Sequence, residues 1–470
     1  MSSHGEETSA PVGSLRPWDG ISVILGIVIG VSLFKAPAPI FASVDAAWQG
    51  MAIWALGGVL SLVGALCYAE LAAADPRPGG DYVYLSRAYA PWVGFLFGWA
   101  QLVAVLTGSL GAMAFVFADY AAVLWRGASP ALIACAAVVA LTIPNVLGVT
   151  LSRRVQNALT ALKLLGLGAL IVAGWWAPAP EVVPVGEPLG GIGFALILVL
   201  YAYGGWNDAA FVAAEVHEPR RNVPRVLIGG TAIVVVLYLL VNLAYLAALG
   251  FGGIRASSAP AADVLRAAAG DAGGRAMSVL VMLSALGAIQ GLVFTGSRIY
   301  ASVGADHPAF AALGRWHPRF RTPARALAVQ AGVAVAWIVG VGSEAGRAFL
   351  DACARFSGLP TLPWDRFGGG FETLVAGTAP VFWLFFLGTG SAVIVLRRRE
   401  PGLARPFRVP LFPWTPLLFC ASCLYMLHAS LSYAGGLAAV GLVPVLLGLP
   451  VYGLSQRAAR RAAGQGAPHR

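Results

Sequence analysis

The chain consists of long runs of apolar residues separated by short polar joints. Twelve runs reach the length of a membrane-crossing helix, which needs about 20 mostly apolar residues. Apolar and polar residues do not alternate within them, so they predict helices and not the strands of a barrel. The expected helices cover residues 19–44, 50–74, 88–123, 130–149, 157–176, 191–216, 226–250, 276–303, 324–341, 372–396, 411–433 and 436–455. The pattern therefore predicts an all-α membrane protein with twelve transmembrane helices.

Composition and charge agree with this interpretation. Apolar residues make up 58% of the 470 residues and charged residues 11%, whereas a soluble domain carries about 25% charge. Of the Arg and Lys residues, 23 are assigned to one side of the expected membrane and seven to the other, with Lys35 left inside the first run. The positive-inside rule then places both termini in the cytoplasm. Because the positive charge is spread over many joints, nucleic-acid binding is not expected.

Catalytic and metal-binding patterns are weak in this sequence. The six His residues show no metal-ligand spacing, and no Ser has the nearby His and acid of a nucleophilic triad. A Walker-type phosphate loop is missing from the sequence, which argues against ATP-driven pumping. We therefore expect neither an enzyme nor a cofactor or metal site.

Two of the expected helices carry glycines near their middle. The first reads GISVILGIVIGVSLFKAPAPIF, with Gly26 and Gly30, and the sixth reads FALILVLYAYGGWNDAAFVAAEV, with Gly204 and Gly205. Glycine costs about 1 kcal/mol relative to Ala inside a helix and permits backbone conformations that other residues avoid. These helices lie five apart, so the interruptions match in two five-helix halves, which in transporters points to the binding site. Close helix packing is the alternative role of such glycines.

Unwinding at these positions would suit one class of ligand. A break leaves N–H groups free at the start of one half-helix and C=O groups free at the end of the other. The free amides favour a carboxylate, and the free carbonyls favour an ammonium group. An α-amino acid carries both groups on one carbon, so two adjacent breaks can bind its zwitterion through backbone atoms alone.

Five motifs in order connect the chain to a known superfamily. They are GIVIGVSLFKAP in helix 1, YAELAAADPRPGGDYVYL after helix 2, YAYGGWN with EVHEPRRNVPRVL in helix 6, FTGSRIYASVGADHPAF with HPRFRTPARAL after helix 8, and LRRREPGLARPFRVP after helix 10. Together they resemble the amino acid–polyamine–organocation superfamily of permeases, most closely its L-type amino acid transporter branch. The resemblance implies a five-plus-five inverted repeat with discontinuous helices 1 and 6. The chain departs from the family's Gly-Ser-Gly in helix 1, where it has Gly30-Val31-Ser32.

The resemblance also implies the organisation of the chain. The expected parts are a cytoplasmic N-terminal tail (1–18), a first repeat of helices 1–5 (19–176), a second repeat of helices 6–10 (191–396), helices 11 and 12 (411–455) and a cytoplasmic C-terminal tail (456–470). The second repeat includes an outer loop, 342–371, that is longer than the usual joint between helices 9 and 10 and is a candidate outer cap.

The family's binding positions carry over to two segments. Four successive backbone positions of helix 1 are expected to bind the substrate carboxylate: Gly30, Val31, Ser32 and Leu33. Carbonyls at both breaks are expected to bind the α-amine, around Ile27, Tyr201, Ala202 and Gly204. Tyr201 stands where the family has an aromatic gate, and Trp206 and Asn207 are expected as pocket walls. Packing in the core is the alternative for the two aromatic residues.

One charged residue is expected inside helix 5. Charge in the hydrocarbon core is costly, which makes Lys163 a functional candidate. In sodium-independent relatives, a lysine at this position occupies the place of the coupling ion and would brace helix 1 against helix 8. Tyr238 of helix 7 is expected to approach it. A buried lysine can lose its proton, so Lys163 is also a candidate carrier of a coupling proton; snorkelling to the inner surface is the alternative.

The sequence thus predicts a secondary-active transporter of L-amino acids, with neutral substrates favoured. It would act in the inner or plasma membrane by alternating access, through sodium-independent exchange or proton-coupled uptake. The alternatives are a cationic amino acid or polyamine antiporter, with Asp208 or Asp119 reading the second charge, and an amino acid sensor that does not transport. The expected partners are the amino acid, the lipid bilayer and a proton. Joint 124–130 has no Cys, so a covalently linked heavy subunit is not expected.

Overall fold

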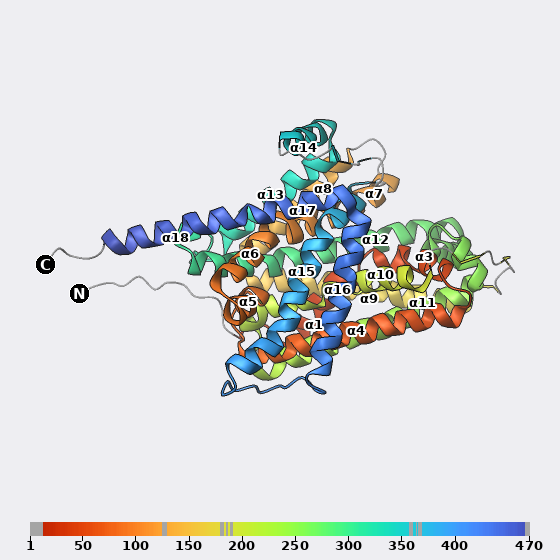
Figure 1. Ribbon diagram of the computed structural model, residues 1–470. Helices are drawn as coiled ribbons and strands as arrows, with labels where there is room; N and C mark the ends of the chain where they lie inside the picture. Colours follow the sequence, from red (N-terminus) through yellow and green to blue (C-terminus); the bar gives the residue numbers. More distant parts are fainter. Residues whose placement is uncertain are drawn as a thin grey trace.

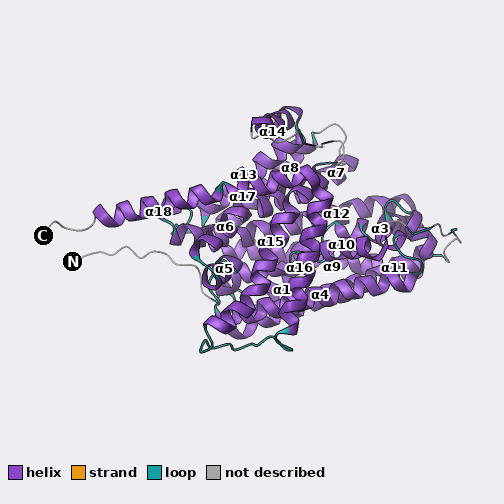
Figure 2. Ribbon diagram, in the orientation of Figure 1, coloured by secondary structure: helices purple, strands orange, loops and turns teal. Residues whose placement is uncertain are grey.

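The computed structural model describes residues 13–465, except 125–128, 179–182, 185–186, 189–190, 357–360, 363 and 365–368. Over these residues the chain is helical (Figure 2), apart from turns, loops and one isolated backbone bridge between Leu15 and Val216. Ten helices in the described ranges are long and apolar enough to cross a membrane. The protein is therefore a multi-pass α-helical membrane protein.

The helices pack into one bundle, from which α18, at the end of the described chain, projects to the left in Figure 1. In chain order they are α1 (Pro17–Val28), α2 (Ser32–Lys35), α3 (Pro37–Ala42), α4 (Ala47–Ala74), α5 (Asp81–Ala88), α6 (Pro91–Ala100), the π-helical η1 (Gln101–Val105), α7 (Leu106–Leu124), α8 (Pro130–Leu147), α9 (Val149–Trp176), α10 (Gly191–Ala202), the 3-10 helix η2 (Trp206–Glu215), α11 (Pro219–Ala256), α12 (Pro260–Asp306), η3 (Pro308–Phe310), α13 (Ala324–Gly342), α14 (Glu344–Phe356), α15 (Gly370–Arg399), α16 (Trp414–Ala434), η5 (Gly435–Ala438), α17 (Ala439–Leu446) and α18 (Gly448–Gln465).

Prolines and apolar faces explain much of this arrangement. Helices α1, α6, α8, α11 and α12 each begin at a proline, whose fixed φ suits the first helical turn and whose missing N–H would have no partner there. Helix α11 packs along α4, and α12 packs along α7 and α9. Large apolar side chains on the outside of the bundle, such as Leu132 and Leu165, are more than 70% exposed, as expected of a surface that faces lipid.

At two places the described helices differ from the twelve separate spans that were expected. The first is divided into α1, α2 and α3, each too short to cross a membrane alone. The last two follow one another within a single apolar stretch, Trp414–Arg457. The count of twelve spans, the repeat boundaries and the inverted symmetry stay predictions.

Both tails and the expected outer loop contain helix that the sequence pattern did not predict. Helix α14 lies within 342–371 and projects from the bundle beside α13 (Figure 1). Helix α18 continues through the expected C-terminal tail to Gln465, and α1 begins at Pro17, inside the expected N-terminal tail. The remaining parts of these predictions, residues 1–12, 357–360, 363, 365–368 and 466–470, lie outside the described residues.

Ion pairs hold the ends of the helices together. Where α4 ends, Glu70 binds Arg397 of α15 with an oxygen–nitrogen distance of 2.5 Å. Burial opposes ionisation of Asp75, but its pairs with Arg77 and Arg87, at 2.7 and 3.0 Å, lower the pKa of that carboxyl. A fully buried pair, Glu215–Arg298 at 2.6 Å, joins η2 to α12. Removing one partner of such a buried pair typically costs about 3–5 kcal/mol.

Candidate functional site

The predicted interruption of helix 1 is present between Val28 and Ser32. In a continuous helix the Gly30 amide would bond to the Gly26 carbonyl, four residues earlier. Here it donates instead to the Val28 carbonyl, with a nitrogen–oxygen distance of 2.7 Å. The last carbonyls of α1 therefore lose their helical partners, and the amides that open α2 have no helical acceptor.

Helix α9 satisfies two of these carbonyls. The Lys163 ammonium group is fully buried and donates to the carbonyl of Gly26 at 2.7 Å and to that of Ile29 at 2.6 Å. One turn earlier on the same face, the Thr160 hydroxyl donates to the Ser22 carbonyl at 3.0 Å. The lysine is therefore a brace across the break and does not snorkel to the surface. Helix α12 lies close by, since a methyl group added at Gly287 would be 3.3 Å from the Lys163 nitrogen.

Helix α11 links the two breaks. The Tyr238 hydroxyl lies 2.7 Å from the Val28 carbonyl and 3.1 Å from the Ala202 carbonyl, and shares its one proton between them. In the described structure, Tyr238 and Lys163 thus bind neighbouring carbonyls of one break and form no hydrogen bond with each other. The carbonyl of Ile27 is left without its helical amide, and Ile27 faces the cavity described below.

The interruption of helix 6 is also present. Helix α10 ends at Ala202, and Gly205 adopts φ +105°, a conformation that favours glycine. A Cβ atom at Gly205 would lie 2.7 Å from Cγ2 of Ile27, so the two breaks approach each other directly. The chain then continues as the 3-10 helix η2.

We expect Gly205→Ala to destabilise the protein. The positive φ and the contact with Ile27, a side chain that is stiff at χ1, together cost about 1–3 kcal/mol. The melting temperature of the purified variant is therefore expected to fall below that of the wild type. Gly229→Ala is the matched control, because a Cβ atom at that helical glycine meets nothing within 4 Å. Equal melting temperatures for the two variants would contradict the prediction.

A cavity of about 150 Å³ lies between the breaks. Predicted residues line it from both segments: Ile27, Gly30, Ser32, Tyr201, Ala202, Gly204 and Asn207. Residues from η1, α7, α12 and α15 also line it, among them Gln101, Ser109, Ala288, Leu292, Thr378, Phe382 and Trp383. The cavity is thus lined mainly by apolar side chains, with backbone and polar side-chain groups at the breaks.

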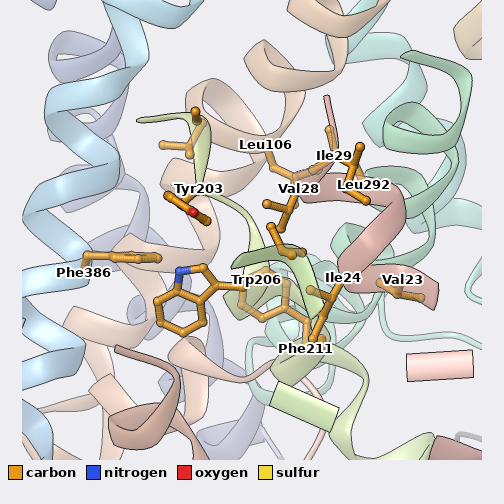
Figure 3. Packing of buried hydrophobic residues seen from close by; sticks show 14 of the residues in the cluster. Val23, Ile24, Val28, Ile29, Leu106, Tyr203, Trp206, Phe211, Leu292 and Phe386 are labelled. Carbon is orange, nitrogen blue, oxygen red and sulfur yellow. The ribbon is translucent and has the colours of Figure 1, made fainter. Parts of the chain in front are cut away.

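Trp206 lies outside this wall. It packs against Tyr68, Phe386 and Phe419 with ring-centroid distances of 5.1, 5.7 and 6.2 Å, and Figure 3 shows its indole directed toward Phe386. Its role in the structure is core packing, the alternative considered from the sequence. The predicted positions Val31 and Leu33 are buried beside the cavity and do not line it, so any contribution from them comes from their backbone amides.

Asp208 lines the cavity, although the sequence left its role open. It is the one charged residue among the described residues of the wall. Asp119, the other acidic candidate, is exposed on α7, and Lys35 is exposed at the end of α2; neither lines the cavity. An acidic residue two positions after the tryptophan of a broken helix was the available sequence signal for Asp208.

Comparison with known proteins identifies the family. The family model for amino acid permeases matches residues 15–450. The chain belongs to this family. The serine/threonine exchanger SteT of Bacillus subtilis is 29% identical over 93% of this chain and 96% of its own length. The b(0,+)-type amino acid transporter 1 of Mus musculus is 28% identical over 87% of this chain and 81% of its own length. The large neutral amino acids transporter small subunit 2 of Mus musculus is 29% identical over 92% of this chain and 78% of its own length.

These relatives place this amino acid permease in the amino acid–polyamine–organocation superfamily, near the L-type branch, as the motifs predicted. One of the relatives is named a small subunit. The absence of a covalently linked partner subunit stays a prediction.

Proposed function

We propose that this permease moves small neutral L-amino acids across the cell membrane by alternating access, without sodium. The observation that carries the proposal is the cavity between two broken helices, where the Ile27 carbonyl and the first amides of α2 lie on either side of Gly30. The substrate ammonium would bind the carbonyl and its carboxylate the amides of Val31, Ser32 and Leu33.

Substrate size and charge follow from the wall. A cavity of 150 Å³ is about the size that holds a benzene-sized molecule, which suits a small side chain. Phe382, Trp383 and Leu292 offer apolar surface to that side chain, and Tyr201 would close over it as a gate. The names of SteT and of the large neutral amino acids transporter agree with neutral substrates.

The Lys163 brace supports independence from sodium. Its ammonium group occupies the carbonyls of Gly26 and Ile29 that a coupling cation would need. Either exchange of amino acids or proton-coupled uptake remains compatible with that arrangement.

A cationic amino acid antiporter is the second candidate, because Asp208 lines the cavity. In that case the carboxylate would pair with the substrate's second ammonium or guanidinium group. The small cavity volume favours the neutral substrate, since a long cationic side chain needs more room than a benzene-sized space.

Counterflow into proteoliposomes tests the proposal. Purified protein is reconstituted into vesicles loaded with unlabelled amino acid, and uptake of a labelled panel is measured with and without sodium. We expect uptake of small neutral amino acids without sodium, and little uptake of arginine, lysine or polyamines. Uptake that requires sodium would contradict the role given to Lys163, preference for arginine would favour the second candidate, and binding without any uptake would indicate a sensor.

A further inference from the structure

Asp208 is a buried acid in the wall of the cavity. It is 7% exposed, and its neighbour Asn207 is 3% exposed with a side-chain oxygen that has no partner among the described residues. Within the described chain, no Arg, Lys or His lies within ion-pair distance of Asp208. A carboxylate inside a membrane protein without a cation is costly, so such residues are rare and mark ion or proton pathways.

The elements around η2 do not supply the missing charge. Helices α1, α4, α11 and α12 pack against η2. The titratable groups that interact with Asp208 are Tyr300 of α12 and Asp81 of α5. Tyr68 of α4 packs against Trp206, Tyr238 of α11 bonds to the Ala202 carbonyl, and Asp19 of α1 pairs with Arg153. Arg298 is bound to Glu215. Asp81 adds negative charge: it accepts hydrogen bonds from Tyr68 and Thr389, and its second oxygen has no partner in the described structure. Two acids therefore lie near the helix 6 break without a bound cation.

We propose that Asp208 carries a coupling proton, one with each amino acid. This inference rests on the proposed function. Because Asp208 and the breaks line one cavity, the carboxylate is reached by water from whichever side the substrate enters. A hydronium ion in the cavity transfers its proton to the carboxylate, forming an O–H bond and leaving water. After the cavity opens to the other side, that bond breaks and the proton passes to water there.

The carboxylate must lose its charge before the cavity closes. Closing removes water, and an ionised carboxylate without a partner then pays a desolvation cost of several kcal/mol. A protonated Asp208 with a zwitterionic amino acid gives a cavity of zero net charge. Lys163 is less suited to this role, because it does not line the cavity and its ammonium group is already bound to two carbonyls.

Three variants in proteoliposomes test the proposal at clamped membrane potential. With acid outside, the wild type is expected to accumulate substrate up to about tenfold per pH unit, the limit for one proton. With Asp208→Asn, the substrate concentration inside the vesicles is expected to rise only to the external concentration. Counterflow by this variant is expected to stay measurable, at a lower rate. Asp208→Glu is expected to restore accumulation. Asp119→Asn, an exposed acid on α7, is the matched control and is expected to behave as the wild type.

Different experimental results would contradict the proposed function and the proton role of Asp208. Without counterflow in the wild type, the proposed function itself fails. The proton role alone is overturned by wild-type counterflow without accumulation in a pH gradient, by accumulation in a sodium gradient, or by accumulation in Asp208→Asn. It is also overturned if that variant loses counterflow and accumulation together, because Asp208 would then bind the substrate amine.

A measurement on the wild type alone covers the case in which Asp208→Asn does not fold. At equal pH on both sides, exchange is expected to slow as the pH rises, because fewer molecules carry the proton needed for closure. An exchange rate that does not change between acid and neutral pH would overturn the proposal.

Discussion

Replacing Lys163 with Met is expected to reduce transport at least about tenfold, which requires a loss of only 1.4 kcal/mol in the rate-limiting state. Methionine has an unbranched side chain that is one heavy atom shorter than that of lysine, and it cannot donate hydrogen bonds. The carbonyls of Gly26 and Ile29, which the ammonium group binds at 2.7 and 2.6 Å, would then be buried without a donor. The helix 1 break would lose the contact that fixes its shape against α9.

Stability is expected to change less than transport in this variant. Two unsatisfied carbonyls cost about 2–6 kcal/mol together, but the variant also avoids several kcal/mol spent on burying the ammonium group. These contributions oppose each other, so the melting temperature should move little while the rate of counterflow falls. Arg154→Met is the matched control, because this cation of α9 is exposed. Full transport by the Lys163 variant would show that the brace is unnecessary.

The interruptions could be predicted because their causes are local. At Gly205 the backbone adopts φ +105°, which glycine accommodates readily, and the glycine pair is visible in the sequence. The start of α9 could not be predicted from the apolar pattern. This helix begins at Val149, well ahead of the expected 157, and its first two turns contain polar side chains that bind neighbouring helices: Ser152 donates to Asn145 of α8, and Gln156 donates to the Ser22 carbonyl of α1. Such hydrogen bonds depend on which helix packs alongside, and they produce no periodic pattern of apolar residues in the sequence.

Which side chains line the cavity depends on how each helix is rotated about its own axis. The position of a residue in the sequence does not determine this rotation. After the break, η2 is a 3-10 helix with about three residues per turn, against 3.6 in an α-helix. In this arrangement Trp206 lies against Tyr68 and Phe386, while Asn207 and Asp208 face the cavity. The motif located the segment, but the side chains that reach the cavity became clear only from the structure.

Ser32→Trp is expected to abolish substrate binding. Ser32 lines the cavity at the start of α2, beside the amides proposed to bind the carboxylate. An indole is larger than the benzene-sized molecule that a cavity of this volume holds. It would therefore occupy the space of the substrate, and we expect affinity to fall at least about a hundredfold, equivalent to 2.8 kcal/mol. Direct binding of labelled amino acid to the purified variant measures this loss without requiring transport.

The position of the added indole decides the interpretation of that result. Ser432→Trp makes the same substitution on the exposed surface of α16, where a tryptophan meets lipid and the cavity is untouched, so its affinity is expected to equal that of the wild type. Loss of binding in the Ser32 variant together with retention in this control would locate the substrate between the two breaks. Undiminished affinity in a folded Ser32→Trp protein would instead mean that the amino acid binds elsewhere, because an occupied cavity cannot also hold the substrate.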